Sequence, residues 1–112
     1  MKAPERGDLV WLDLNPQAGR EQAGRRPVLV LTPSAYNRLV GLALFCPVTN
    51  QVKGYAFETA LPPGLRVQGV ILADHVRSLD WRKRRAEFIC VAPDEVVEDV
   101  AAKVHALISG EE

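Results

Sequence analysis

The densest group of chemically useful side chains lies in residues 19–27, which read Gly-Arg-Glu-Gln-Ala-Gly-Arg-Arg-Pro. One carboxylate, Glu21, stands there among the arginines Arg20, Arg25 and Arg26. A guanidinium binds phosphate well because its planar fork donates two parallel hydrogen bonds. A carboxylate among cations keeps its charge, which suits a general base or a group that orients a hydroxyl. The segment therefore predicts chemistry at a phosphate, although a salt-bridged surface loop would use the same residues.

A second polar segment, residues 47–55, reads Pro-Val-Thr-Asn-Gln-Val-Lys-Gly-Tyr. It supplies a hydroxyl, two amides, a cation and an aromatic ring. Single-stranded RNA is recognised by such a set, with amides at base edges, lysine at phosphate and tyrosine stacked on a base. An ordinary hairpin loop has the same composition, so the segment alone leaves both interpretations open.

Other kinds of catalytic site have little support in the sequence. His105 flanks the apolar face of a predicted helix, where we expect a packed or boundary side chain. His75 follows a predicted strand beside Asp74, which gives weak support for an acid–base role. The sequence contains no phosphate-binding glycine motif, nucleophile elbow or zinc-ligand spacing, and its carboxylates are scattered. We expect any catalysis to proceed without a metal or a cofactor.

Short strands that end at glycine or proline must position these segments. Apolar alternation or continuous apolar runs predict strands at residues 9–14, 27–31, 42–46, 57–61, 69–73 and 87–91. We expect Pro47 only at a strand end or a bulge. Residues 34–37 are typical of a turn or a single helical turn.

A helical period is clear only in residues 93–108. Pro93 suits the first helical position, and Gly110 suits a left-handed cap. The apolar face contains Val96, Val97, Val100, Ala101, Val104, Leu107 and Ile108. The sequence thus predicts a mainly β fold with a C-terminal helix. The sheet should be small and strongly curved, or a partial barrel, with the helix over one open end or face.

The chain has 112 residues, of which 47% are hydrophobic and 25% charged, as in a single folded domain over residues 1–112. No apolar run approaches a membrane span, and the N-terminus lacks the apolar core of a secretory signal. Cys46 and Cys90 lie in apolar runs and are expected to be buried free thiols. We therefore expect a cytoplasmic protein.

A net charge of zero conceals an uneven distribution of charge along the chain. Residues 1–85 carry a net charge of +6, whereas residues 86–112 carry −6. A basic body can bind a polyanion despite the neutral total. A mixed, solvated surface is the alternative.

The order of motifs resembles that of the MazF/PemK family of toxin–antitoxin endoribonucleases. The sequence Glu-Gln-Ala-Gly-Arg-Arg-Pro at residues 21–27, directly before a predicted strand, is the most specific of these motifs. The resemblance continues in order through residues 7–13, 15–16, 29–33, 36–37, 47–49, 53–55, 57–58, 72–74, 76–82 and the C-terminal helix. It therefore covers nearly the whole chain.

This resemblance implies a homodimer with a partly open, SH3-like barrel. It also implies an enzyme that cuts single-stranded RNA, including mRNA, at short sequences without metal, leaving 2′,3′-cyclic phosphate and 5′-hydroxyl ends. The residues that match the family's catalytic positions are Glu21, Arg26 and Thr49. Glu21 would take the proton from a 2′-hydroxyl, while Arg26 and Thr49 would stabilise charge on the phosphate oxygens.

The surrounding polar residues are expected to bind RNA. They are Arg20, Gln22, Arg25, Asn50, Gln51, Lys53, Asp74 and Arg77. The chain departs from PemK-type relatives, which use Arg-x-Asp near a strand end and a histidine in the first loop. Here residues 72–74 read Leu-Ala-Asp, and Arg20 replaces that histidine. Asp74 is therefore expected to be structural or to face RNA, and His75, where many members have glutamine, has no assigned role.

The resemblance also implies a cognate, acidic, MazE-like antitoxin whose disordered tail folds into the basic groove. Two other functions remain open. A CcdB-like toxin of the same fold would bind DNA gyrase, and a non-catalytic module would bind RNA only. Glu21 together with Arg26 favours the nuclease, because neither alternative needs a carboxylate beside phosphate-binding arginines.

Overall fold

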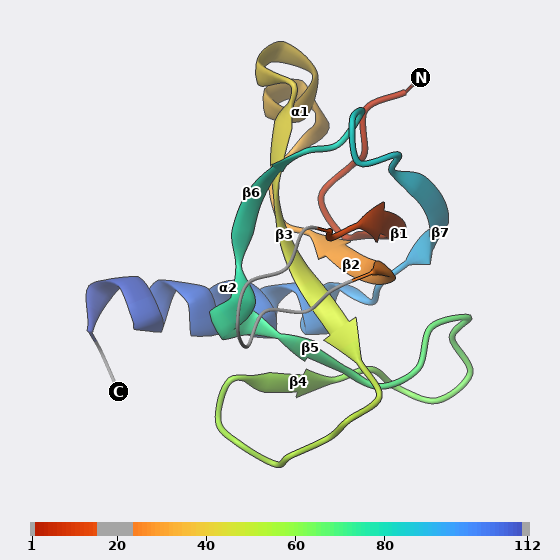
Figure 1. Cartoon of the computed structure of the whole chain (residues 1–112). Helices are drawn as coiled ribbons and strands as arrows, with labels where there is room; N and C mark the ends of the chain where they lie inside the picture. The colour runs from red at the N-terminus through yellow and green to blue at the C-terminus, as the bar shows by residue number, and fades with distance from the viewer. Residues whose placement is uncertain (1, 16–23, 111–112) are drawn as a thin grey trace.

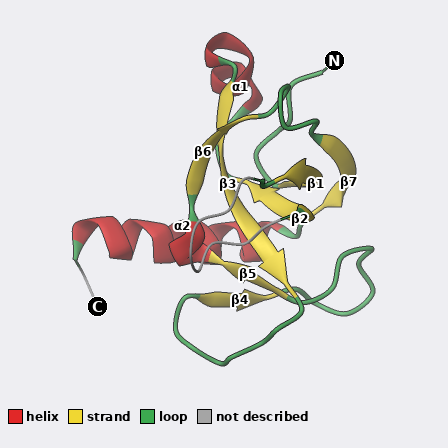
Figure 2. Cartoon of the chain, viewed as in Figure 1, coloured by secondary structure: helices red, strands yellow, loops and turns green. Residues whose placement is uncertain are grey.

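The computed structural model describes residues 2–15 and 24–110. Within these ranges the chain forms strands, two α-helices and one short 3-10 helix (Figures 1 and 2). The elements in order are β1 (Asp8–Asp13), β2 (Arg25–Val30), α1 (Ser34–Val40), β3 (Leu42–Thr49), β4 (Glu58–Ala60), β5 (Val70–Leu72), η1 (Ala73–His75), β6 (Arg77–Asp80), β7 (Glu87–Val91) and α2 (Asp94–Ser109). The predicted class, mainly β with a C-terminal helix, is confirmed.

The strands form one antiparallel sheet in the order β4-β5-β3-β2-β1-β7, and β6 pairs with β3 outside this path. The sheet is open, because its two ends, β4 and β7, do not pair with each other among the described residues. The predicted partly open sheet is therefore confirmed. β3 is the central strand, with β2 along one edge and β6 followed by β5 along the other.

Pro47 lies within β3, so its predicted place at a strand end or bulge was wrong. The pairing of β6 reaches Phe45, and the pairing of β5 begins at Val48. Pro47 therefore falls where one edge of β3 changes partner, and a missing N–H donor is tolerated there. β6 itself was not predicted, since Leu79 is its only fully buried residue and gives little alternation.

Alternate side chains of β1 and β2 enter two separate hydrophobic cores. One core contains Leu9, Leu29, Cys46, Val48 and Ile71, together with the α2 residues Val96, Val97, Val100 and Val104. The other contains Val10, Leu12, Val28, Val30, Phe45, Leu79 and Trp81. α2 covers the first core, as predicted, and passes behind β3 in Figure 1.

The end of α2 differs from the prediction. Leu107 and Ile108 are 44% and 79% exposed, and His105 is exposed rather than packed. The reason is the length of the helix, whose C-terminal turns extend beyond the strands in Figure 1. Pro93 is the N-cap instead of the first helical residue, and Gly110 closes the helix with φ of 75°, as predicted.

Two smaller predictions also need correction. α1 covers Ser34–Val40, more than the single turn expected, because Gly41 in a left-handed conformation ends it only after Val40. Cys46 is buried and free as predicted, whereas Cys90 is free but only half-buried, because it lies on the sheet-edge strand β7. No helix in the described ranges is both long enough and apolar enough to cross a membrane.

Candidate functional site

Three strand ends meet at one end of the sheet. β1 ends at Asp13, β2 begins at Arg25 and β3 ends at Thr49, and neighbouring strands in this group are antiparallel. Val28 of β2 pairs with Pro47 of β3, and Arg26 and Thr49 each lie two residues farther toward that end. The backbone ladder thus places a guanidinium and a hydroxyl from distant parts of the sequence on adjacent strands.

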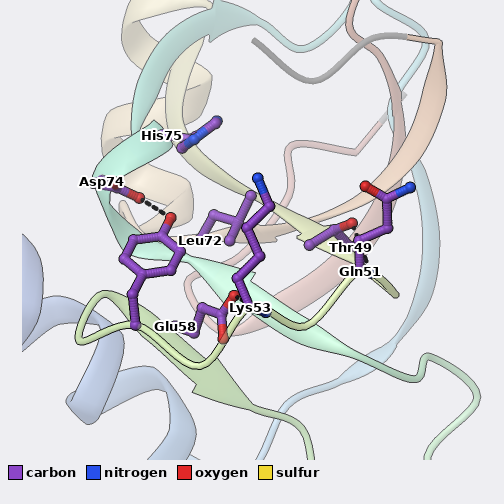
Figure 3. A pocket seen from close by; sticks show the side chains of 8 residues that line it. Thr49, Gln51, Lys53, Glu58, Leu72, Asp74 and His75 are labelled. Carbon is purple, nitrogen blue, oxygen red and sulfur yellow. Dashed lines mark hydrogen bonds between the residues drawn. The ribbon is translucent and has the colours of Figure 1, made fainter. Parts of the chain in front are cut away.

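A cavity of about 550 Å³ opens beside Thr49. Its lining residues are Thr49, Gln51, Lys53, Tyr55, Glu58, Leu72, Asp74 and His75. Figure 3 shows Thr49 and Gln51 on one side, Asp74 and His75 on the other, and the Lys53 side chain rising between them. Four residues predicted to act on RNA (Thr49, Gln51, Lys53 and Asp74) therefore line one cavity.

Thr49 is held tightly at the end of β3. Its side chain is buried, and Oγ1 accepts a hydrogen bond from the Gln51 amide at 3.1 Å. This bond uses the oxygen as acceptor, so the hydroxyl proton can be donated to another group. Gly69 packs against the same residue with φ of 114°, and a Cβ there would lie 2.3 Å from the Thr49 carbonyl oxygen. Only glycine fits this contact.

Asp74 has a structural contact as well as a place in the cavity. Its Oδ1 accepts a hydrogen bond of 2.8 Å from the Tyr55 hydroxyl. Burial, with this bond to Asp74 second, raises the pKa of Tyr55 to about 12. The phenol therefore stays protonated at neutral pH and joins residues of the β3–β4 loop to η1.

Cys46 lies beneath the site and is chemically inert. Burial, followed by the nearby charge of Asp74, raises the pKa of its thiol to about 12. Its Sγ is 3.9 Å from the carbonyl oxygen of Ala73. Since the thiolate is the reactive form, Cys46 is not a nucleophile at neutral pH.

Arg25 lies in a different cluster from the cavity residues. Its guanidinium donates to Asp13 at 3.0 Å, to the Arg85 carbonyl at 2.8 Å and to Glu87 at 3.3 Å. Arg85, then Arg25, lowers the pKa of Asp13 through hydrogen bonds. Because successive side chains of a strand point to opposite faces, Arg26 faces away from this cluster.

The other predicted residues are spread around the site. Asn50 is exposed directly after β3, with its Oδ1 close to Gly69. Arg77 is half-buried in β6 opposite Phe45 and does not line the cavity. Arg20, Glu21 and Gln22 lie outside the described residues. In the part of the chain that is described, no group of three or more His, Cys, Asp or Glu side chains could hold a metal ion.

Sequence reasoning missed Glu58 and Leu72 and left His75 unassigned, yet all three line the cavity. Glu58 accepts hydrogen bonds from the backbone amides of Lys53 and Gly54, each at 2.9 Å. The available signal was Gly54, since a left-handed glycine in a polar loop marks a tight turn whose amides need acceptors.

The comparisons with known proteins agree with this geometry. Residues 5–108 match the family model described as PemK-like, MazF-like toxin of type II toxin-antitoxin system. The endoribonuclease toxin MazF of Escherichia coli K12 is 47% identical over 106 residues, which are 94% of each chain.

Two solved structures from Deinococcus radiodurans are also similar. One, of MazF, superposes with a TM-score of 0.93 at 56% identity and covers 96% of this chain and 97% of the other. The second, a MazE–MazF complex, gives a TM-score of 0.84 at 49% identity over 98% of both chains. The resemblance inferred from the motifs is therefore confirmed, and the chain belongs to the PemK-like, MazF-like toxin family of type II toxin–antitoxin systems.

Proposed function

We propose that the chain is an endoribonuclease toxin that cuts single-stranded RNA, including mRNA, at short sequences without a metal ion. The observation that carries this proposal is the pairing of strand ends, which sets Arg26 beside the strand that presents Thr49 to the cavity. A guanidinium and a hydroxyl at that spacing suit the oxygens of one phosphate. The similarity to the Escherichia coli endoribonuclease toxin MazF supports the same activity.

The proposed reaction is attack by a ribose 2′-hydroxyl on the adjacent phosphorus. Glu21 removes the hydroxyl proton, the new P–O2′ bond forms, and the bond from phosphorus to the 5′-oxygen breaks. The products are a 2′,3′-cyclic phosphate and a 5′-hydroxyl. DNA is spared because it lacks the attacking group. Glu21 lies outside the described residues, so its role here rests on the family motif at residues 21–27.

Arg26 and Thr49 act on charge rather than as proton donors. Each donates hydrogen bonds to the non-bridging phosphate oxygens, where negative charge grows in the transition state. A guanidinium is not deprotonated in proteins. We therefore assign protonation of the leaving 5′-oxygen to water or to a general acid other than Arg26.

RNA contacts fall into two groups. Gln51, Lys53 and Asp74 line the cavity and meet the bases and phosphates beside the cut, with Asn50 at its edge. Arg77 and, from the family motif alone, Arg20 and Gln22 make further contacts to RNA; the last two lie outside the described residues. The hydrogen bonds of Arg25 to Asp13 and Glu87 make it a brace of the strand ends, with a smaller share in binding phosphate.

The proposed partner is a cognate MazE-like antitoxin. The Deinococcus radiodurans relative is solved as a MazE–MazF complex. The net charge of +6 over residues 1–85 suits an acidic, disordered antitoxin segment as well as RNA. We further propose a cytoplasmic homodimer. The comparisons do not favour a gyrase-binding toxin or a non-catalytic RNA-binding module, since the similar curated proteins are endoribonucleases.

The test is incubation of the purified protein, free of antitoxin, with a long unstructured RNA in excess EDTA. We expect discrete cuts with 5′-hydroxyl ends, and their loss in a Glu21→Ala variant that still binds RNA. Mapping the ends gives the cleavage sequence. Intact RNA in the presence of folded toxin, or equal cutting by Glu21→Ala, would contradict the proposal.

A further inference from the structure

The loop between β3 and β4 carries Gln51 and Lys53 but is not part of the sheet. Residues 51–55 adopt neither helix nor strand, and all five are exposed. Backbone amides outside a ladder need other partners if a loop is to keep one conformation. The contacts that fix this loop therefore decide where its side chains meet RNA.

The main contact is a pair of hydrogen bonds that the Glu58 carboxylate accepts from two successive backbone amides; we call this pair the grip. Glu58 Oε2 accepts from the Lys53 N–H and Oε1 accepts from the Gly54 N–H, each at 2.9 Å. Gly54 has φ of 80°, and a left-handed residue lets neighbouring amides converge on one anion. Charge-assisted hydrogen bonds of this kind are stronger than neutral ones.

Glu58 is itself held from the side of α2. The ammonium of Lys103 donates to the Glu58 carbonyl at 2.7 Å and to Thr59 Oγ1 at 3.0 Å. Lys103 also pairs with Asp99 at 2.9 Å, and Asp99 accepts from the Thr59 hydroxyl at 2.7 Å. The first residue of β4 is therefore fixed against the helix while its side chain holds the loop.

A second contact closes the far side of the loop. The Tyr55 hydroxyl donates to Asp74 of η1, and the Glu58 amide donates to the Tyr55 carbonyl at 3.1 Å. Between these contacts the Lys53 side chain rises into the cavity (Figure 3). The Lys53 ammonium is therefore positioned by the hydrogen bond between the Lys53 amide and the Glu58 carboxylate.

We propose that Glu58 is a positioning residue that holds residues 50–55 in the conformation that binds RNA. Its carboxylate is occupied by two backbone amides, so it acts through the loop and not as a base. Thr49 and Arg26 belong to β3 and β2, where pairing with neighbouring strands fixes the backbone. Loss of the grip therefore weakens RNA binding and cleavage selectivity and leaves the chemical step nearly intact. This inference rests on the proposed RNA cleavage.

The experiment compares wild type with Glu58→Gln, and uses Glu98→Gln as a matched control on the exposed face of α2. Glutamine keeps the size but offers one acceptor in place of two. We expect the amides of Lys53 and Gly54 to exchange hydrogen at least about tenfold faster. For a short RNA substrate, KM should rise about tenfold while kcat stays within about threefold. Glu98→Gln should match wild type in both measurements.

Two results would overturn the inference. Unchanged exchange of the two amides would show that other contacts hold the loop. A fall in kcat with KM unchanged would show that Glu58 acts on the chemical step. Lys103→Met provides a second test, since loss of the ammonium should speed hydrogen exchange of the same two amides to a smaller degree.

If wild type failed to cut RNA, the proposed function would fail, and the exchange data would still decide whether Glu58 holds the loop.

Discussion

The end of β3 and the β3–β4 loop both line the cavity, but they are held by different means. Thr49 and Arg26 belong to strands in the sheet, where neighbouring backbones fix each residue. Lys53 and Gly54 depend on a single carboxylate from Glu58. Groups that stabilise a transition state must be placed within fractions of an ångström. A loop that binds RNA can change, and with it the RNA sequence that is preferred, without moving those groups. We therefore expect the strand residues to determine the rate of cleavage and the β3–β4 loop to determine which RNA is bound.

The largest expected effect is at the strand ends. Thr49→Ala removes the hydroxyl that we propose donates to the phosphate, so kcat should fall by about 10²–10³-fold. KM should rise much less than kcat falls: Thr49→Ala also removes the Oγ1 acceptor of the Gln51 amide, but the Lys53 amide stays bonded to Glu58. Single-turnover cleavage of a short RNA measures the chemical step. A rise in KM with kcat preserved would remove the distinction between the two parts.

Gly69→Ala tests how rigidly the strand end is held. The added methyl group would lie 2.3 Å from the Thr49 carbonyl oxygen, in a backbone conformation with φ of 114°. We expect a loss of about 2–4 kcal/mol in the free energy of unfolding, and a lower kcat. Gly64→Ala is the matched control, since its φ is 94° but no atom lies within 4 Å of the added carbon. Its cost should be about 1 kcal/mol. Urea denaturation of both variants makes the comparison, and equal losses would argue against the contact.

Tyr55→Phe tests the loop from its other side. The variant keeps the ring but loses the hydrogen bond to Asp74, so KM should rise about three- to tenfold with kcat unchanged. An ultraviolet pH titration gives an independent measure. The pKa of about 12 predicts that Tyr55 ionises only in strong alkali in wild type, and Asp74→Asn should lower that pKa. Ionisation of Tyr55 below pH 10 in wild type would contradict the described contact.

The smallest effect concerns the support beneath the loop. Hydrogen bonds from Lys103, then Thr59, lower the pKa of Asp99 below its ordinary value of 3.8. A carboxyl whose pKa falls on folding stabilises the folded state above its unfolded pKa and loses this effect as the pH drops through the folded value. Stability should therefore decline below about pH 4, and Asp99→Asn should flatten part of that decline. Melting temperatures from pH 2 to 7 measure it, and identical profiles would exclude a role for the pair.

Much of the sheet could be predicted from local patterns, because buried faces impose alternation on β1 and continuous apolar runs on β3. β6 was not predicted, because only one of its residues is buried and the strand therefore shows no apolar alternation. In the site, the sequence predicted a catalytic role for Thr49 and RNA binding for Gln51 and Lys53, and the structure places all three in the lining of one cavity. The roles of the neighbouring arginines Arg25 and Arg26 were harder to tell apart. The difference depends on β2 beginning at Arg25, because the Arg25 side chain then bonds to Asp13 and that of Arg26 lies on the other face.

Glu58 was missed for a different reason: Gly54 indicates a turn whose amides need an acceptor, but it does not indicate which residue supplies that acceptor. The proposed function of Glu58 in the loop depends on hydrogen bonds that its carboxylate accepts from backbone amides four and five residues earlier, and no period in the sequence encodes such bonds. The same holds for Tyr55 and Asp74, which are nineteen residues apart. Periodicity predicts elements, but contacts between a loop and its neighbours depend on the finished fold.

The central place of β3 has a consequence for the order of events during synthesis. Leu42 pairs with Asp80, Thr49 pairs with Val70, and the core beneath them is closed by α2, which ends at Ser109. Contacts so distant along the chain form only after the later segments have left the ribosome. The cavity of a nascent chain is therefore incomplete until η1 has left the ribosome, and the core beneath it is incomplete until α2 has, so a ribosome-bound chain that stops short of these segments has no formed site.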